Sequence, residues 1–216
     1  MEGAHLVNIL VTLLIVTALF VVLARTPGRA ALLYSLQSFV LVCTFLAIAA
    51  FFDVAPLYHW AGTSFVTKTV LLPAILYFAF RRTDPSRLPP PLLNPAAMLM
   101  LAAVVVVVAA AVVGRVHLPL AADFKPVMVV SFSLIFLGLA CIITQRDILK
   151  QIFGYCLMEN GSHLALALLG HDAPELVEVG IGSDAIFAVI AMTFFATRIQ
   201  TVLHTYDDRA LMTLKD

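Results

Sequence analysis

The sequence predicts an all-α, polytopic membrane protein, a helical bundle with about seven transmembrane helices. Of its 216 residues 62% are hydrophobic and 12% are charged, and the mean hydropathy is +1.03. A soluble domain has about 45–50% apolar and about 25% charged residues. The apolar runs are long enough to cross a bilayer and lack the alternation of a barrel strand, so they predict helices. At roughly 27 to 30 residues per span and turn, about seven spans fill the chain and leave no room for an extramembrane catalytic domain.

The predicted spans are separated by short segments rich in proline, glycine and charge. They cover His5–Leu23, Ala31–Phe52, Ala61–Phe80, Pro95–Val113, Phe124–Thr144, Ile148–Gly170 and Pro174–Arg198 or just beyond. The predicted breaks include Thr26-Pro27-Gly28, the segment Asp53–Tyr58 around Pro56, and the Pro-rich loop 84–91. We expect one membrane domain, 1–216, made of three helices and that loop (1–94), a connecting helix and loop (95–121), and three further helices with a short tail (122–216).

Charge and motif content exclude several classes of function. Thirteen basic and 13 acidic residues give a net charge of zero, so the chain offers no basic face and we expect no nucleic-acid partner. The three cysteines, Cys43, Cys141 and Cys156, lie in apolar stretches without CxxC spacing, which favours a structural role. GxGxxG, P-loop and HExxH motifs are absent from the sequence. We therefore expect no catalytic, metal or cofactor site in this chain.

The distribution of basic residues predicts the orientation of the bundle. Ten of the 13 lysines and arginines follow spans one, three, five and seven: Arg25, Arg29, Arg81, Arg82, Arg87, Arg146, Lys150, Arg198, Arg209 and Lys215. Because short cytoplasmic loops accumulate lysine and arginine, the N-terminus is predicted outside and the C-terminus inside. Spans one to three and five to seven then enter with the same polarity. This pattern fits either a weak internal repeat or the plain alternation of any helical bundle.

Three charged residues lie at membrane depth, where topology does not require them. Counting 1.5 Å per residue from the nearest basic flank puts Glu159 about 13 Å deep, Lys68 about 20 Å and Asp184 about 21 Å, on three different helices. A charge at mid-bilayer costs on the order of 3 kcal/mol, so such residues usually mark a functional site or a paired polar interior. The three groups form either an inert internal salt bridge or carboxylates that take up and release protons beside a lysine that modulates them.

The neighbours of these residues favour a polar path. Glu159 and His163 are four residues apart and share a helix face, which suits a histidine that relays protons or orients the carboxylate. Pro73 has no N–H to donate, so we expect the carbonyl of Thr69 to be free beside Lys68 and to hold a water or the ammonium. The predicted proton-translocation residues are Glu159, Asp184, Lys68 and His163.

Two long stretches resemble a known family. Residues 145–164, QRDILKQIFGYCLMENGSHL, and 173–190, APELVEVGIGSDAIFAVI, closely resemble component E of hydrogenase-4, a membrane subunit of formate hydrogenlyase-type complexes. The similarity extends more thinly to Gln37-Ser38 and to Phe65–Lys68. It thus covers essentially the whole chain.

The last three spans are also similar to subunit K of respiratory complex I and to the small subunit of multisubunit sodium/proton antiporters. That family has a buried glutamate on its second and on its third helix. An ungapped match puts Asp184 on the second acid and Cys156 on the first. Here Glu159 lies three residues later, about one turn along the same face, so its role is not inherited one for one.

This resemblance implies a multi-pass subunit of the cell inner membrane. Its expected partners are large antiporter-like membrane subunits, the large and small hydrogenase subunits and a formate dehydrogenase module, within a lipid bilayer. A nickel–iron centre and iron–sulfur clusters are expected in those partners and not in this chain. The implied function is a proton or sodium path coupled to hydrogen evolution by a group 4 nickel–iron hydrogenase. The alternatives are a purely structural anchor, a subunit of a cation/proton antiporter and a stand-alone transporter.

Overall fold

The computed structural model consists of helices joined by short connections. It describes residues 2–81, 88–115, 124–169 and 175–208, with side chains from residue 5 onward and, in the last segment, from residue 186. The helices are α1 (Glu2–Leu23), α2 (Pro27–Phe52), α3 (Ala55–Ser64), the π-helix η1 (Phe65–Leu71), α4 (Leu72–Phe80), α5 (Pro95–Arg115), α6 (Lys125–Thr144), α7 (Ile148–Leu169) and α8 (Glu175–Leu203). Within these ranges the β-structure consists of one isolated bridge, Asp147 to Asp207. The predicted all-helical fold class is confirmed.

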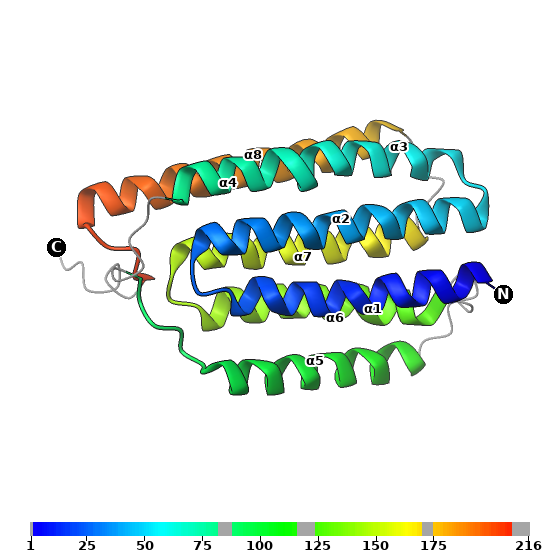
Figure 1. Ribbon diagram of the computed structural model, residues 1–216, viewed down its shortest axis with the longest axis horizontal. Helices are drawn as coiled ribbons and strands as arrows, with labels where there is room; N and C mark the ends of the chain where they lie inside the picture. The colour runs from blue at the N-terminus through cyan, green and yellow to red at the C-terminus, as the bar shows by residue number, and fades with distance from the viewer. Residues whose placement is uncertain (1, 82–87, 116–123, 170–174, 209–216) are drawn as a thin grey trace.

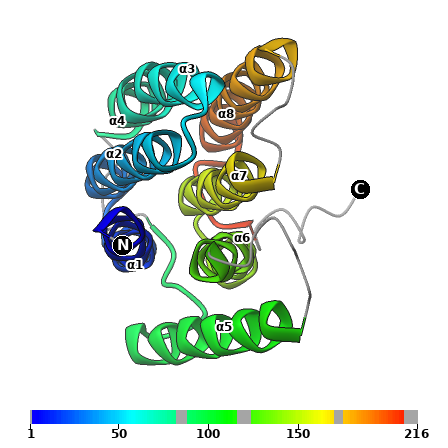
Figure 2. The same cartoon turned by 90° about the vertical axis from the view of Figure 1, so that its right-hand side faces the viewer.

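The helices form two layers that face each other (Figures 1 and 2). One layer contains α1, α2 and the α3–η1–α4 helix, and the other contains α6, α7 and α8. The layers pair in order, since α1 contacts α6, α2 contacts α7, and α3 and α4 contact α8. Helix α5 crosses below α1 and α6 and packs mainly on α6 (Figure 2). The layers thus follow the division into spans one to three and five to seven.

The dimensions of the helices suit a membrane. Six stretches within the described residues are long and apolar enough to cross one: His5–Leu23, Pro27–Phe52, Ala55–Phe80, Pro95–Arg115, Lys125–Thr144 and Ile186–Leu203. Helix α7 has the length of a span, 22 residues, but carries more polar side chains. Large apolar side chains point outward, with Met100 72%, Val107 67% and Phe187 68% exposed. An apolar exterior of this kind is stable in lipid and not in water.

Two predicted boundaries were wrong for the same reason. Helix α2 begins at Pro27 and not at Ala31, with the Thr26 side chain accepting a hydrogen bond from the Arg29 N–H at 3.4 Å. The third span begins at Ala55 and not at Ala61. Proline was read as a breaker in both segments. In the first turn of a helix its missing N–H has no intrahelical partner to lose, so proline starts both helices.

The remaining boundaries agree more closely. Helix α5 extends to Arg115, two residues past the prediction, and α6 begins at Lys125. The predicted end of span six, Gly170, lies outside the described residues. Helix α8 continues to Leu203, five residues beyond Arg198, where His204 adopts a left-handed conformation with φ 55°. Histidine is among the non-glycine residues enriched in that conformation.

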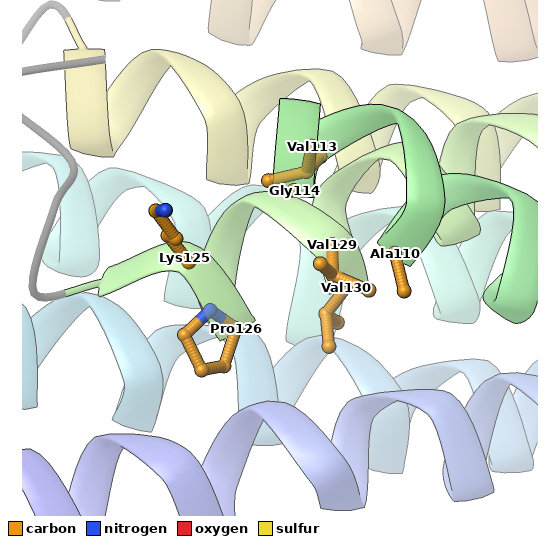
Figure 3. A pocket seen from close by; sticks show the side chains of 7 residues that line it. All are labelled: Ala110, Val113, Gly114, Lys125, Pro126, Val129 and Val130. Atoms are coloured by element: carbon orange, nitrogen blue, oxygen red, sulfur yellow. The ribbon is translucent and has the colours of Figure 1, made fainter. Parts of the chain in front are cut away.

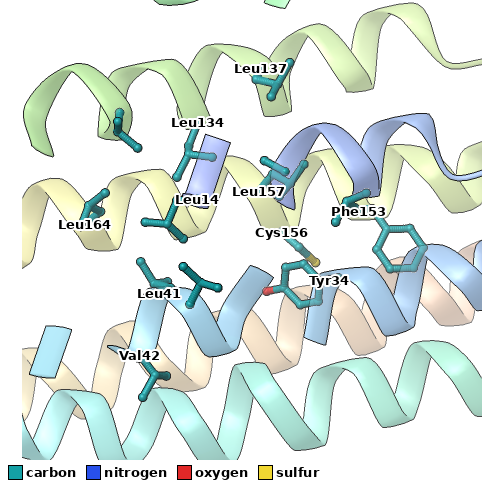
Figure 4. Close-up of a cluster of buried hydrophobic side chains, with 14 of the residues drawn as sticks. Leu14, Tyr34, Leu41, Val42, Leu134, Leu137, Phe153, Cys156, Leu157 and Leu164 are labelled. Atoms are coloured by element: carbon teal, nitrogen blue, oxygen red, sulfur yellow. The ribbon is translucent and has the colours of Figure 1, made fainter. Parts of the chain in front are cut away.

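The core lies between the layers, and the tightest packing is within the second layer, where α6 meets α7. Figure 4 shows Tyr34 of α2 reaching α7 beside Phe153 and Cys156, with ring centroids of Tyr34 and Phe153 6.3 Å apart. A Cβ at Gly161 would lie 2.7 Å from the Ser131 carbonyl oxygen, and one at Gly154 2.8 Å from that of Gly138. The backbones of α6 and α7 therefore touch, which fixes the position of α7 and of the polar side chains that it carries.

Candidate functional site

Lys68 enters the bundle from the π-helical turn of the third span. The N–H of Leu72 donates to the carbonyl of Thr67, five residues back, and η1 passes into α4 at Pro73, which has no N–H. We expected the Thr69 carbonyl to hold a water or the ammonium of Lys68. The structure corrects this: the Ser35 hydroxyl of α2 donates to that carbonyl at 2.6 Å, and the ammonium turns toward α7. The widened turn is thus held to α2 by a side-chain hydrogen bond.

Three side chains of α7 surround the ammonium. The Nζ of Lys68 lies 2.8 Å from Glu159 Oε1 and donates to Asn160 Oδ1 at 3.0 Å. It also makes a short contact with Nδ1 of His163. Residues 159, 160 and 163 are spaced so that they lie on neighbouring faces of one helix turn. About one turn of α7 therefore provides two oxygens, one from Glu159 and one from Asn160, and the ring nitrogen of His163 for the Lys68 ammonium.

The proton inventory of this cluster defines the charge states of its members. An ammonium has three N–H donors and no acceptor, and the three α7 atoms provide one acceptor each. Nδ1 of His163 must be unprotonated to accept, so the imidazole is neutral with its proton on Nε2 while Lys68 is charged. The Glu159 Oε1 to His163 Nδ1 distance is 3.6 Å, so both atoms can face the same ammonium. The cluster is a carboxylate and ammonium pair with zero net charge.

Burial makes this pair electrostatically strong. Lys68 is 1% exposed and His163 8%, while the Glu159 side chain is 12% exposed. Taking a single charge out of water costs several kcal/mol, and that cost is offset only where the partner charge and the hydrogen bonds are in place. Neither oxygen of the Glu159 carboxylate accepts a hydrogen bond from any residue that the structure describes, although Oε1 forms the ion pair with Lys68. Of the two oxygens, Oε2 is the one that the ion pair with the lysine leaves free.

The cluster continues into α2 on the far side of Asn160. Its Nδ2 donates to Gln37 Oε1 at 2.7 Å and to Ser38 Oγ at 3.3 Å. These three residues are fully buried, each with 0% exposure. The polar site thus joins three helices: the third span through Lys68, α7 through Glu159, Asn160 and His163, and α2 through Gln37 and Ser38.

The structure brings together three of the four predicted residues. Lys68, Glu159 and His163 meet as described, whereas Asp184 is in α8 and its side chain lies outside the described residues. The four predicted site residues do not include Asn160 or Gln37. The available signal was chemical, since each is an amide in a span whose neighbours are mostly apolar, and a buried amide needs partners.

Cavities elsewhere offer little chemistry by comparison. A crevice of about 390 Å³ between α5 and α6 is lined by apolar side chains, with Lys125 at its edge (Figure 3). A second crevice, about 280 Å³, opens between the same helices near Val108 and Phe136. Among the described residues, three or more His, Cys, Asp or Glu side chains nowhere gather in a group that could hold a metal ion. The buried cluster around Lys68 is therefore the candidate site.

Comparison with known proteins gives one match to the C-terminal part of the chain and several over its full length. The family of NADH-ubiquinone/plastoquinone oxidoreductase chain 4L matches residues 126–209, which include α6, α7 and α8. Hydrogenase-4 component E from Escherichia coli (strain K12), from Escherichia coli O157:H7 and from Shigella flexneri is in each case 45% identical over 215 residues, covering 100% of this chain and of the relative. No solved structure matches the chain.

Identity at this level over the full length is decisive for family membership. The match to chain 4L covers the second helical layer, and the full-length matches add the first layer and α5. Lys68 and Gln37 come from the first layer, Glu159 and Asn160 from the second. The model of NADH-ubiquinone/plastoquinone oxidoreductase chain 4L matches the C-terminal part, and the whole chain belongs to the hydrogenase-4 component E family.

Proposed function

We propose that this protein is a membrane subunit of a hydrogen-evolving group 4 nickel–iron hydrogenase complex and forms part of a path for protons, with sodium as the alternative ion. The observation that carries the proposal is the buried Lys68, Glu159 and His163 cluster between the two layers. A buried charge pair is weak evidence for stability, because apolar residues of similar volume often do as well. At membrane depth such a pair usually belongs to an ion pathway.

The chemistry follows from the protonation states of the pair. While Lys68 is charged, Glu159 is held as a carboxylate and His163 as a neutral acceptor. A proton that reaches Glu159 Oε2 neutralises the carboxylate and weakens its hold on the ammonium. The ammonium then has two remaining acceptors, Asn160 and His163, and the shift of charge changes the field felt by the next carboxylate along the path. Asp184 on α8 is the proposed next group.

The partners follow from the family and not from the geometry. The relatives are components of hydrogenase-4, so this chain is proposed to lie beside large antiporter-like membrane subunits and to dock with the hydrogenase large and small subunits and a formate dehydrogenase module. The nickel–iron centre and the iron–sulfur clusters would belong to those partners. The proposed location is the cell inner membrane. In this arrangement electron transfer occurs in the peripheral arm, and this subunit contributes a segment of the polar axis.

The test replaces the carboxylates and keeps their shape. Glu159→Gln and Asp184→Asn are introduced singly into the complex, and formate-driven proton translocation is measured in inverted membrane vesicles together with hydrogen evolution. We expect each variant to lower the number of protons translocated per hydrogen formed. Asp53→Asn is the matched control, because Asp53 is an exposed carboxylate at the C-terminal end of α2 and asparagine tolerates its left-handed φ of 55°.

The outcomes separate this proposal from its alternatives. Normal translocation in both variants, with the complex intact, would overturn the role of the carboxylates. Loss of the assembled complex in both variants, with normal translocation by the complexes that remain, would indicate a structural anchor. Purification of this subunit with antiporter subunits and without hydrogenase subunits would place it in a cation/proton antiporter.

A further inference from the structure

The polar contacts of Asn160 extend from the candidate site to α2, and nothing in the proposed function requires them. Asn160 lies between Lys68 on one side and Gln37 with Ser38 on the other. It is fully buried. An amide exchanges no proton near neutral pH, so the part played by Asn160 has to come from where it holds its neighbours.

The charge of Lys68 fixes the orientation of both amides. An ammonium can only donate, so Asn160 must turn its oxygen to Lys68 and its NH₂ group to α2. Gln37 must then present its own oxygen to that NH₂ group, at 2.7 Å. Its Nε2 is left without a hydrogen-bond partner among the described residues. An unpartnered buried donor is unfavourable. Gln37 nevertheless keeps this orientation because Asn160, whose oxygen is turned toward the Lys68 ammonium, offers it only an NH₂ group.

A second contact of α2 reaches the backbone next to Lys68. The Ser35 hydroxyl donates to the carbonyl of Thr69 at 2.6 Å, inside the π-helical turn. Less than one turn of α2, from Ser35 to Ser38, therefore holds both the backbone that carries Lys68 and the amide that accepts from its ammonium. The two attachments restrain the lysine from opposite ends.

We infer that Asn160, braced by Gln37 and Ser38 of α2, is a positioning residue that holds the Lys68 ammonium against Glu159. Its consequence for ion transfer rests on the proposed function, whereas the positioning itself is a property of the three helices. Without the Asn160 oxygen, the ammonium keeps two acceptors on α7 and is free to move between them. Gln37 touches neither Lys68 nor Glu159 through any contact that the structure shows, so it acts through Asn160.

The experiment measures how strongly Lys68 and Glu159 depend on each other. Lys68→Met, Glu159→Gln and the double variant are made in the assembled complex, and the midpoint temperature is read from the loss of the monodisperse peak of a fluorescently tagged subunit. The shortfall of the double variant relative to the sum of the single variants is the coupling. The same set is then repeated in the Asn160→Leu and Gln37→Leu backgrounds.

We expect both backgrounds to reduce the coupling by about a third or more, because Asn160 provides one of three acceptors. Asn160→Leu and Gln37→Leu combined should reduce it no further than Asn160→Leu alone. Thr44→Val is the matched control, since Thr44 is a fully buried polar residue of α2 whose hydroxyl bonds within its own helix, to Val40. That background should leave the coupling unchanged. If the complex with Asn160→Leu does not assemble, the coupling measured in the Gln37→Leu background decides the test.

Two results would overturn the inference. The first is unchanged coupling in the Gln37→Leu background, and the second is an equal reduction by Thr44→Val. Proton translocation by the same variants is measured separately. If Glu159→Gln and Asp184→Asn both translocate normally while the coupling still depends on Gln37, the proposed function fails and the positioning role of Asn160 stands.

Discussion

At the scale of single residues, Lys68 depends entirely on side chains from other helices. Its three donors are matched by Glu159, Asn160 and His163, all on α7. A lysine in the interior is tolerable only with a carboxylate partner and further hydrogen bonds. Changing any one of these four side chains alone should therefore destabilise the protein, and the size of the loss measures how strongly the four depend on one another.

Lys68→Met should destabilise the assembled subunit by about 3 kcal/mol, because it leaves the Glu159 carboxylate buried without its partner charge. Lys68→Met combined with Glu159→Gln should recover much of this loss, since no buried charge then remains. The midpoint of thermal disassembly in detergent measures both effects. Lys125→Met, which removes an exposed lysine at the start of α6, should change it little. A double variant as unstable as the two single losses added together would contradict the pairing.

Asp147 makes the stability depend on pH at the connection between α6 and α7. Burial raises the pKa of this carboxyl from 3.8 to about 6, although the Leu149 N–H donates to its Oδ1 at 2.9 Å. The segment after α8 covers the connection, with the Ile148 N–H donating to the Tyr206 carbonyl at 3.2 Å. Because the folded-state pKa is raised, the contribution of Asp147 to the free energy of unfolding is most favourable below pH 4 and is lost as the pH rises through about 6.

Asp147→Asn should therefore be stabilising at pH 8, with an upper value of roughly 3 kcal/mol from the shift of about two units. Asparagine keeps an oxygen for the Leu149 N–H and removes the charge. The gain in midpoint temperature over the parent should shrink as the pH is lowered from 8 to 4. Asp53→Asn, at an exposed carboxylate, is measured over the same range as the control. A gain at pH 8 that persists undiminished at pH 4 would show that charge is not the cause.

At the scale of elements, α6 and α7 depend on glycine at their crossing. The Ser131 hydroxyl of α6 donates to the carbonyl of Gly161 at 2.8 Å, next to Asn160 of the site. Close approach of this kind, with small residues and a hydroxyl at the interface, is a common way for helices to associate in membranes. The packing of the two helices thus sets where the acceptors for Lys68 lie.

Gly161→Ala should separate the two helices. Its Cβ would lie 2.7 Å from the Ser131 carbonyl oxygen and 2.8 Å from the Ile135 nitrogen, and backbone atoms cannot move aside as a side chain can. Overpacking of this kind costs about 1–3 kcal/mol, and we expect lower thermal stability together with a weakened Lys68 and Glu159 coupling. Gly62→Ala is the control because nothing lies within 4 Å of its Cβ position. Equal effects of the two substitutions would show that helix propensity, not the crossing, is responsible.

The elements also show what a sequence can predict and where it fails. Hydrophobic length predicted seven spans because the bilayer requires about 20 apolar residues whatever the packing. The starts at Pro27 and Ala55 were missed because proline both breaks a helix and begins one. The π-helical turn at Phe65–Leu71 was missed entirely. One of its carbonyls, that of Thr69, accepts a hydrogen bond from Ser35 of another helix, and no local pattern reports such a partner.

At the scale of the whole molecule, the site lies where the two layers meet. Counting residues along each helix predicted that Lys68 and Glu159 both lie at membrane depth. Depth does not say which faces meet. The pairing of α2 with α7, which brings Gln37 to Asn160, is a property of layer order and could not be obtained from either helix alone. The contribution of Asn160 and Gln37 to the site could therefore be recognised only from the arrangement of the two layers.

The orientation of the bundle in the membrane stays a prediction, and the arrangement of the layers makes it testable. Helix α1 begins at one end of the bundle and α8 ends at the other (Figure 1), so the two ends of the chain are predicted on opposite sides. Arg25, Arg29, Arg146 and Lys150 flank connections at the end where α8 finishes, and lysine and arginine accumulate on the cytoplasmic side. A green fluorescent protein joined after Asp216 should therefore fluoresce, and alkaline phosphatase in the same place should be inactive. Active phosphatase would show that the topology is inverted.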